Sequence, residues 1–167
     1  MRIIALLFVG CALAVTMLAP VRAQNALVTF KVMSPETALK LARATLDSCR
    51  KQGFQVSVAV VDRMGVTQVL LRDRFAGAHT PETAIRKAWT AVSFRTNTTE
   101  LVEVAKPGAQ QFGIHHVPGA LIVGGGVTVQ GGGSMVGGVG VSGAPGGPAD
   151  EACAKKGIEA VEDDLNF

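Results

Sequence analysis

Residues 120–143 read ALIVGGGVTVQGGGSMVGGVGVSG and have the most regular alternation of apolar runs and glycines in the chain. Three apolar runs, at 120–123, 127–129 and 135–141, are separated by glycine triplets. This pattern is typical of short strands joined by glycine turns. The wider segment 108–147 holds 15 of the 20 glycines. We expect them to form tight turns and to let the backbone approach a ligand or another subunit closely.

The chain before this stretch predicts a hairpin, because β-branched runs at 54–62 and 66–72 flank the turn residues Met64 and Gly65. Helices are indicated where Ser34-Pro35 and Thr80-Pro81 supply starting signals before apolar residues at helical spacing. The other expected elements are helices at 34–51, 81–95, 98–105 and 107–113, a last helix from Pro148, and a short lead-in strand at 27–32. Hairpins dominate over βαβ crossovers. The sequence therefore predicts an α/β (α+β) fold, an antiparallel five-stranded sheet flanked by helices.

The first residues have the features of a secretory signal peptide. Met1-Arg2 is a basic start, residues 3–18 are apolar without a charge, and Val21-Arg22-Ala23 fits a cleavage site. We expect a signal over 1–23, a single domain over 24–167, and a periplasmic or secreted protein. A membrane anchor and a lipoprotein attached through Cys11 are the alternatives, although the apolar run is short for a span of about 20 residues.

Removal of the signal changes the charge. The full chain has 16 basic and 13 acidic residues and a net charge of +3. Arg2 and Arg22 leave with the signal, so the mature chain carries +1 and has no membrane span. This balance, together with only 5% aromatic residues, argues against a nucleic-acid partner.

One motif points to a dinucleotide but lacks its context. Residues 138–143 fit G-x-G-x-x-G. A dinucleotide site needs these glycines to open a helix, whereas Pro145 and Pro148 follow here, and no P-loop lysine is present.

The mature chain keeps two cysteines, Cys49 and Cys153. Cys49 lies late in the first predicted helix and Cys153 early in the last one, both on apolar faces. Two antiparallel helices on one face of the sheet would bring them together, and export supplies an oxidising compartment. A disulfide and a pair of buried thiols are therefore both open.

Three histidines, His79, His115 and His116, lie in loops or at element edges. Adjacent histidines in an extended chain point to opposite sides, so a structural zinc site is not indicated. One of the three could ligate a haem iron or contact a haem edge, with Phe112 as an apolar neighbour. The alternative is surface or capping histidines.

Other polar side chains could complete such a site. Arg72 and Arg74 could meet haem propionates. The helix at 81–95 presents Thr83, Lys87, Thr90 and Phe94 on one face. This face is either a pocket wall or a stripe that contacts solvent or another subunit.

Several motifs together resemble the GlcG/HbpS family of haem-binding proteins. They are Val58–Gly65 (VAVVDRMG), Arg72 with Phe75–Ala78 (FAGA), Lys87–Ala91 (KAWTA), Pro118–Val127 (PGALIVGGGV) and Val136–Gly143 (VGGVGVSG), followed by Asp150. The match runs from about Ser34 to Val161. The resemblance implies a profilin-like α/β/α sandwich and assemblies up to octamers. It also implies haem binding or haem breakdown in exported members, and corrinoid binding in a related domain.

The resemblance also suggests site residues. Thr90 corresponds to the threonine of the helix motif, and His116 matches a histidine of exported haem-binding members. We expect any iron ligand among Thr90, His79 and His116, with His115, Arg74, Lys87 and Phe112 as further haem-binding residues. Apart from that iron, no metal site is expected.

The function expected is therefore that of an exported protein that binds haem or a similar tetrapyrrole, for haem sensing or haem breakdown, and that forms a homo-oligomer. A corrinoid is the alternative ligand. A small-molecule enzyme that uses the same pocket and a ligand-free structural oligomer are the alternative functions, and a binding protein is favoured over an enzyme.

Overall fold

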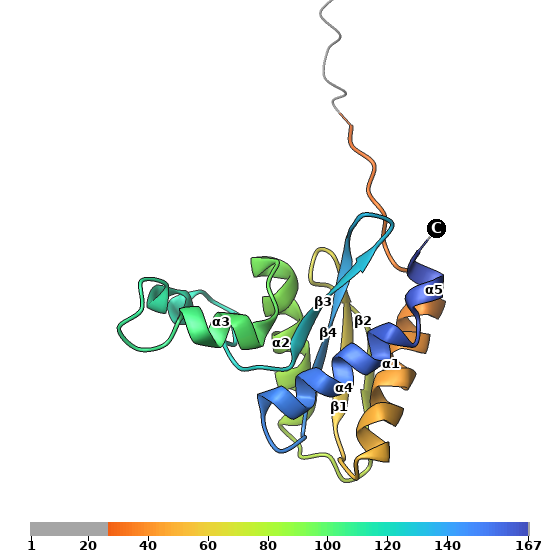
Figure 1. Ribbon diagram of the computed structural model, residues 1–167, viewed down its shortest axis with the longest axis horizontal. Coiled ribbons are helices and arrows are strands. Elements are labelled where there is room, and N and C mark those ends of the chain that lie inside the picture. Colours follow the sequence, from red (N-terminus) through yellow and green to blue (C-terminus); the bar gives the residue numbers. More distant parts are fainter. Residues whose placement is uncertain (1–26, 167) are drawn as a thin grey trace, which may run out of the picture.

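The structure is a computed structural model that describes residues 27–166, so the expected signal peptide at 1–23 lies outside the described residues (Figure 1). The elements, in chain order, are α1 (Pro35–Lys51), β1 (Ser57–Asp62), β2 (Thr67–Arg72), α2 (Thr80–Phe94), α3 (Thr98–Val104), the 3-10 helix η1 (Phe112–His116), β3 (Gly126–Gly131), β4 (Ser134–Ser142), α4 (Gly147–Glu159) and α5 (Glu162–Leu165).

The strands form one antiparallel sheet in the order β2-β1-β4-β3. The expected hairpin is β1 and β2, and β4 pairs with the other side of β1, with Val58 opposite Val141 and Val60 opposite Val139. The predicted α+β class with an antiparallel sheet flanked by helices is confirmed, although the sheet has four strands instead of five.

Residues 120–123, expected as the fifth strand, have no strand partner. Their backbone bonds to side chains of α2 instead: the Leu121 N–H donates to Thr90 Oγ1 at 2.9 Å, and the Arg86 guanidinium donates to the Ala120 carbonyl at 2.9 Å. Once side chains satisfy these groups, the segment needs no ladder.

Two further expectations were wrong. The lead-in at 27–32 is not a strand, and Leu27 and Val28 are exposed. No helix covers the expected span 107–113, and the short η1 at Phe112–His116 overlaps only its last two residues.

Helices cover both faces of the sheet, so the fold has three layers (Figure 1). Val58 and Val60 of β1 and Val139 and Val141 of β4 alternate with their neighbours and point to one face, where α1 and α4 bury them. The opposite face is covered by α2, whose Ala88 and Val92 pack on Val61.

Glycines in β4 allow this second packing to be very close. A Cβ atom at Gly140 would lie 2.0 Å from the Ala84 carbonyl oxygen of α2, and one at Gly138 would lie 2.7 Å from Val92 Cγ1. The expected neighbour of these glycines was a ligand or another subunit. The structure corrects this, because the backbone of α2 occupies that space.

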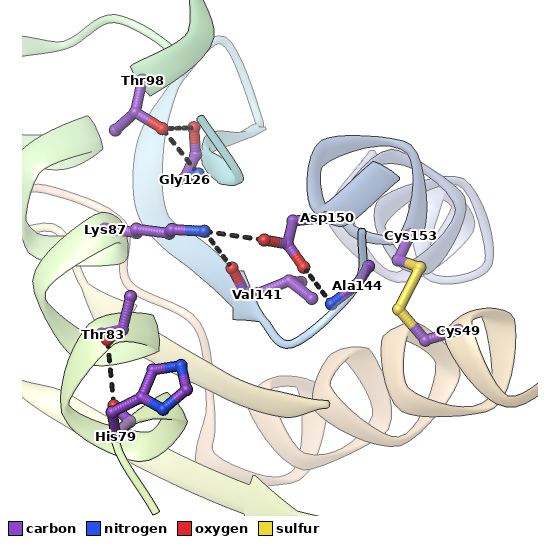
Figure 2. Close-up of polar contacts among 10 residues, drawn as sticks. All are labelled: Cys49, His79, Thr83, Lys87, Thr98, Gly126, Val141, Ala144, Asp150 and Cys153. Carbon is purple, nitrogen blue, oxygen red and sulfur yellow. Dashed lines mark hydrogen bonds and ion pairs between the residues drawn. A yellow bond between two sulfur atoms is a disulfide. The ribbon is translucent and has the colours of Figure 1, made fainter. Parts of the chain in front are cut away.

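On the other face, α1 and α4 are joined by a Cys49–Cys153 disulfide with a Cα–Cα distance of 5.3 Å. Of the two open alternatives, the structure therefore has the bridge. Both cysteines are fully buried, and the bond ties the first half of α4 to the end of α1 (Figure 2).

Candidate functional site

A cleft of about 490 Å³ lies where the start of α2 meets the loop between β4 and α4. Its lining includes His79 and Lys87 from the sequence-predicted set, together with Asp150. Phe54, Phe75 and Val123 contribute apolar wall. The volume lies within the range of small-molecule sites, about 300–1,000 Å³.

Lys87 is the central charge of this site. Its side chain is only 2% exposed, and its Nζ donates to Asp150 Oδ2 at 2.7 Å and to the Val141 carbonyl at 2.9 Å (Figure 2). The Val141 carbonyl belongs to the end of β4, beneath α2. A buried ammonium requires such partners, so sheet, α2 and α4 together fix its position.

Asp150 holds the other side of the pair. It lies in the first turn of α4, and its Oδ1 accepts a hydrogen bond from the Ala144 N–H at 3.0 Å. The loop reaches this geometry through Gly143 and Gly146, which have φ values of +130° and +115°. Burial raises the pKa of Asp150, while the hydrogen bond and charge of Lys87 act in the opposite direction.

The rim of the cleft carries an imidazole. His79 precedes α2 and is exposed, and its carbonyl accepts a hydrogen bond from Thr83 Oγ1 at 2.9 Å (Figure 2). Below it, Thr80 Oγ1 is 2.8 Å from Ser57 Oγ, which joins the start of α2 to β1. The cleft thus has the His79 imidazole at its rim, apolar side chains along its wall and the Lys87–Asp150 ion pair at its bottom.

The other predicted histidines are elsewhere. Residues 98–119, which we call the arm, stand to one side of the sandwich (Figure 1). Phe112, His115 and His116 are exposed on η1 within the arm, and none of them lines the cleft. The rings of Phe112 and His115 are 5.1 Å apart, and His115 Nε2 is 3.0 Å from the Ala105 carbonyl oxygen.

Thr90 and Arg74 also lie outside the lining. Thr90 is fully buried, and its hydroxyl donates to the Arg86 carbonyl at 2.7 Å while accepting from the Leu121 N–H. Arg74 is exposed on the loop between β2 and α2. The structure therefore gathers two of the seven predicted residues in the cleft, His79 and Lys87.

Asp150 lines the cleft but was not among the site residues expected from the sequence. The available signal was a carboxylate two residues after Pro148, in the first turn of a helix that follows a glycine loop, where the helix dipole favours an acidic side chain. A lysine within the small-residue motif Lys87–Ala91 needs such a partner, but nothing local links the two positions.

The described residues, 27–166, lack two features that would point to other functions. None of their helices has the length and hydropathy that a membrane span requires. No cluster of three or more histidine, cysteine, aspartate and glutamate residues in this part of the chain could hold a metal ion.

The fold and the cleft define a three-layer α/β/α sandwich with a lysine–aspartate pair buried beneath a histidine-bearing rim. Residues 33–159 match the family model described as "Haem degrading protein HbpS-like". The chain belongs to this HbpS-like family.

Solved structures of relatives share the fold. The crystal structure of a double mutant of HbpS from Streptomyces reticuli is 43% identical, with a TM-score of 0.76, and the match covers 86% of this chain and 97% of that one. The crystal structure of a PduOC–haem complex is 33% identical, with a TM-score of 0.72 over 77% of this chain and 94% of that one.

A curated relative is longer. The corrinoid adenosyltransferase PduO of Salmonella typhimurium is 37% identical over 106 residues, which are 62% of this chain and 32% of that protein. The chain therefore spans about a third of the length of this relative.

Proposed function

We propose that this protein binds haem or a related tetrapyrrole in the cleft between α2 and the loop before α4. The observation that carries the proposal is the meeting of the His79 imidazole with apolar wall in one cleft of about 490 Å³. Histidine is a common axial ligand of haem iron, and the porphyrin face requires apolar contact. Membership of the HbpS-like family and the haem complex of the relative PduOC support the same ligand.

The residues present fit this group. His79 would hold the iron, with Phe54, Phe75 and Val123 against the macrocycle, and Arg74 on the neighbouring loop would meet a propionate. Bound haem would supply the redox chemistry that sensing or breakdown needs. Lys87 is already neutralised by Asp150, so it shapes the base of the cleft.

Thr90 has no direct role in the proposed site, because it is fully buried and its hydroxyl is bonded within its own chain, whereas His116 is exposed. Both lie outside the cleft of their own chain. The exposed arm could carry His116 to the cleft of a second copy, so we include a homo-oligomer, between a dimer and an octamer, in the proposed function.

We also propose that the protein is exported to the periplasm or secreted, and that it takes part in haem sensing or haem breakdown. Mass spectrometry of the protein from its native host should find Gln24 as the first residue. An intact Met1 in a cytosolic fraction would contradict export.

A corrinoid is the alternative ligand, supported by the corrinoid adenosyltransferase PduO relative.

One observation favours an enzyme as the second candidate. The Lys87–Asp150 pair is buried yet lines a cleft, and buried charged pairs in clefts are common at sites of proton transfer. This alternative predicts turnover of a small molecule without iron. A ligand-free structural oligomer predicts neither binding nor turnover.

Hemin titration of the exported protein, followed by absorption spectroscopy, tests the proposal. We expect a saturable shift of the Soret band that the His79→Ala variant weakens or displaces. A spectrum identical to that of hemin adsorbed on an unrelated protein would show that the proposal is wrong.

A further inference from the structure

A second hollow, of about 320 Å³, lies at the other end of α2, beside the turn between β1 and β2. Its lining consists of Arg63, Met64, Val92, Ser93, Arg95 and Met135. Two guanidinium groups and a hydroxyl are thus the polar groups of the lining side chains, and no carboxylate is among them.

The two arginines lack acidic partners in the described part of the chain. Six ion pairs occur there, and neither Arg63 nor Arg95 belongs to one. Arg63 lies over the ring of Phe30, 4.6 Å from its centroid. The adjacent acid, Asp62, is engaged by the turn, because its Oδ1 accepts from the Met64 and Val66 N–H groups at 2.8 and 3.0 Å.

Arg95 has an unusual backbone. It ends α2 in the left-handed conformation, with φ +53° and ψ +36°, and among residues 27–166 it is the only non-glycine residue with a positive φ. Glycine is the usual residue at such a helix end, since a Cβ atom is strained there. The helix dipole favours any cation in the last turn and does not require this conformation. The residue with this strained backbone, Arg95, also lines the hollow.

We propose that this hollow binds a small organic anion or phosphate compound. Arg63 and Arg95 would donate to its carboxylate or phosphate oxygens, since guanidinium matches the geometry of both. The thioethers of Met64 and Met135 and the side chain of Val92 would contact an apolar part of the ligand. The inference is independent of haem binding, because the lining shares no residue with the cleft around Lys87.

The test is calorimetric titration of the full exported protein at low ionic strength, once with sodium phosphate and once with sodium succinate. We expect at least one of them to bind saturably at one site per chain. Arg63→Gln and Arg95→Gln should each weaken that binding about tenfold or more, as for charge-assisted contacts. Saturation by phosphate alone or by succinate alone assigns the anionic group.

The matched control is Arg43→Gln, which removes an exposed arginine of α1, the helix on the opposite face of the sheet from α2. It should change binding by less than about twofold, the size expected of general charge effects that salt screens. The proposal is overturned if neither anion saturates, or if Arg43→Gln weakens binding as much as the other two variants.

Arg95→Gly separates ligand binding from helix termination. Glycine removes the strain at φ +53°, so the unfolding midpoint should rise while anion binding falls about tenfold or more. A raised midpoint with unchanged anion binding would show that Arg95 only ends the helix, and would overturn the proposal. Hemin titration of the same variant should match the wild type, so failure here is distinguishable from failure of the proposed function.

Discussion

The cleft and the arm both carry residues that the sequence associated with haem, yet they are built differently. In the cleft, Lys87 and Asp150 have side chains 2% and 3% exposed and are held by α2, α4 and β4. In the arm, η1 has no buried residue. The buried apolar side chains of the arm, Leu101 and Ala105, form one cluster with Ala120 and Ile122, and Trp89 of α2 packs against it.

This difference has a physical basis. A buried charge tolerates little displacement, since its partners must stay within hydrogen-bond distance. The charged side chains at the bottom of the cleft are therefore fixed in position. The arm leaves Val102, Val104, Phe112 and Val117 exposed, so its surface is available to another molecule.

The largest expected effect is on the cleft. Lys87→Met leaves Asp150 buried without its cation, which should cost about 3–5 kcal/mol of unfolding free energy. Urea unfolding measures it. The matched control is Lys106→Met in the arm, an exposed lysine, with a change of at most about 0.5 kcal/mol. An equal loss of unfolding free energy in both variants would contradict the conclusion that the cleft is more tightly fixed than the arm.

The disulfide should stabilise the cleft end and not the arm. Replacing Cys49 and Cys153 by serine opens a link over 104 residues, which should cost about 2–4 kcal/mol. Hydrogen exchange of the amides in 143–150 should accelerate, because the first turn of α4 loses its anchor. Faster exchange in 98–119 instead would indicate that the arm depends on the bridge.

Hemin affinity compares the regions directly. His79→Ala should weaken it about tenfold or more, equivalent to about 1.4 kcal/mol, because the imidazole is at the cleft rim. His116→Ala and Thr90→Ala should have smaller effects, and that of His116→Ala should appear only in oligomeric samples. A loss with His116→Ala in monomer, together with wild-type affinity of His79→Ala, would move the site to the arm.

The smallest effect concerns pH. Burial raises the pKa of Asp150 in the folded protein, so the folded state holds this proton more tightly than the unfolded state. Protonation of Asp150 therefore stabilises the folded state. This contribution to the free energy of unfolding is complete below the pKa of an unfolded aspartate, about 3.9, and declines as the pH rises through the raised pKa of the folded protein.

Asp150→Asn lacks this proton equilibrium. The stability advantage of the wild type over Asp150→Asn should therefore narrow as the pH rises through that window. Urea midpoints between about pH 3 and 7 measure it. A widening advantage would contradict the raised pKa.

The sequence alone determined most elements and the class of the fold. The β1–β2 hairpin follows from two β-branched runs around Met64 and Gly65, and α1 and α2 begin at the expected Ser-Pro and Thr-Pro signals. These signals are local, because capping and side-chain periodicity depend on neighbouring residues. The predicted antiparallel helices also placed Cys49 and Cys153 close together, so that the sequence left a disulfide and a pair of buried thiols as the two possibilities.

Tertiary structure alone decided the rest. Residues 120–123 have the composition of a strand, but the side chains of Arg86 and Thr90 bind their backbone. The partner of Lys87 lies 63 residues away at Asp150, and the helix over Gly140 is distant in sequence. His79 and His116 are separated for the same reason. Composition and periodicity indicate which side chains must be buried or hydrogen-bonded. Their partners depend on which distant segments the fold brings together.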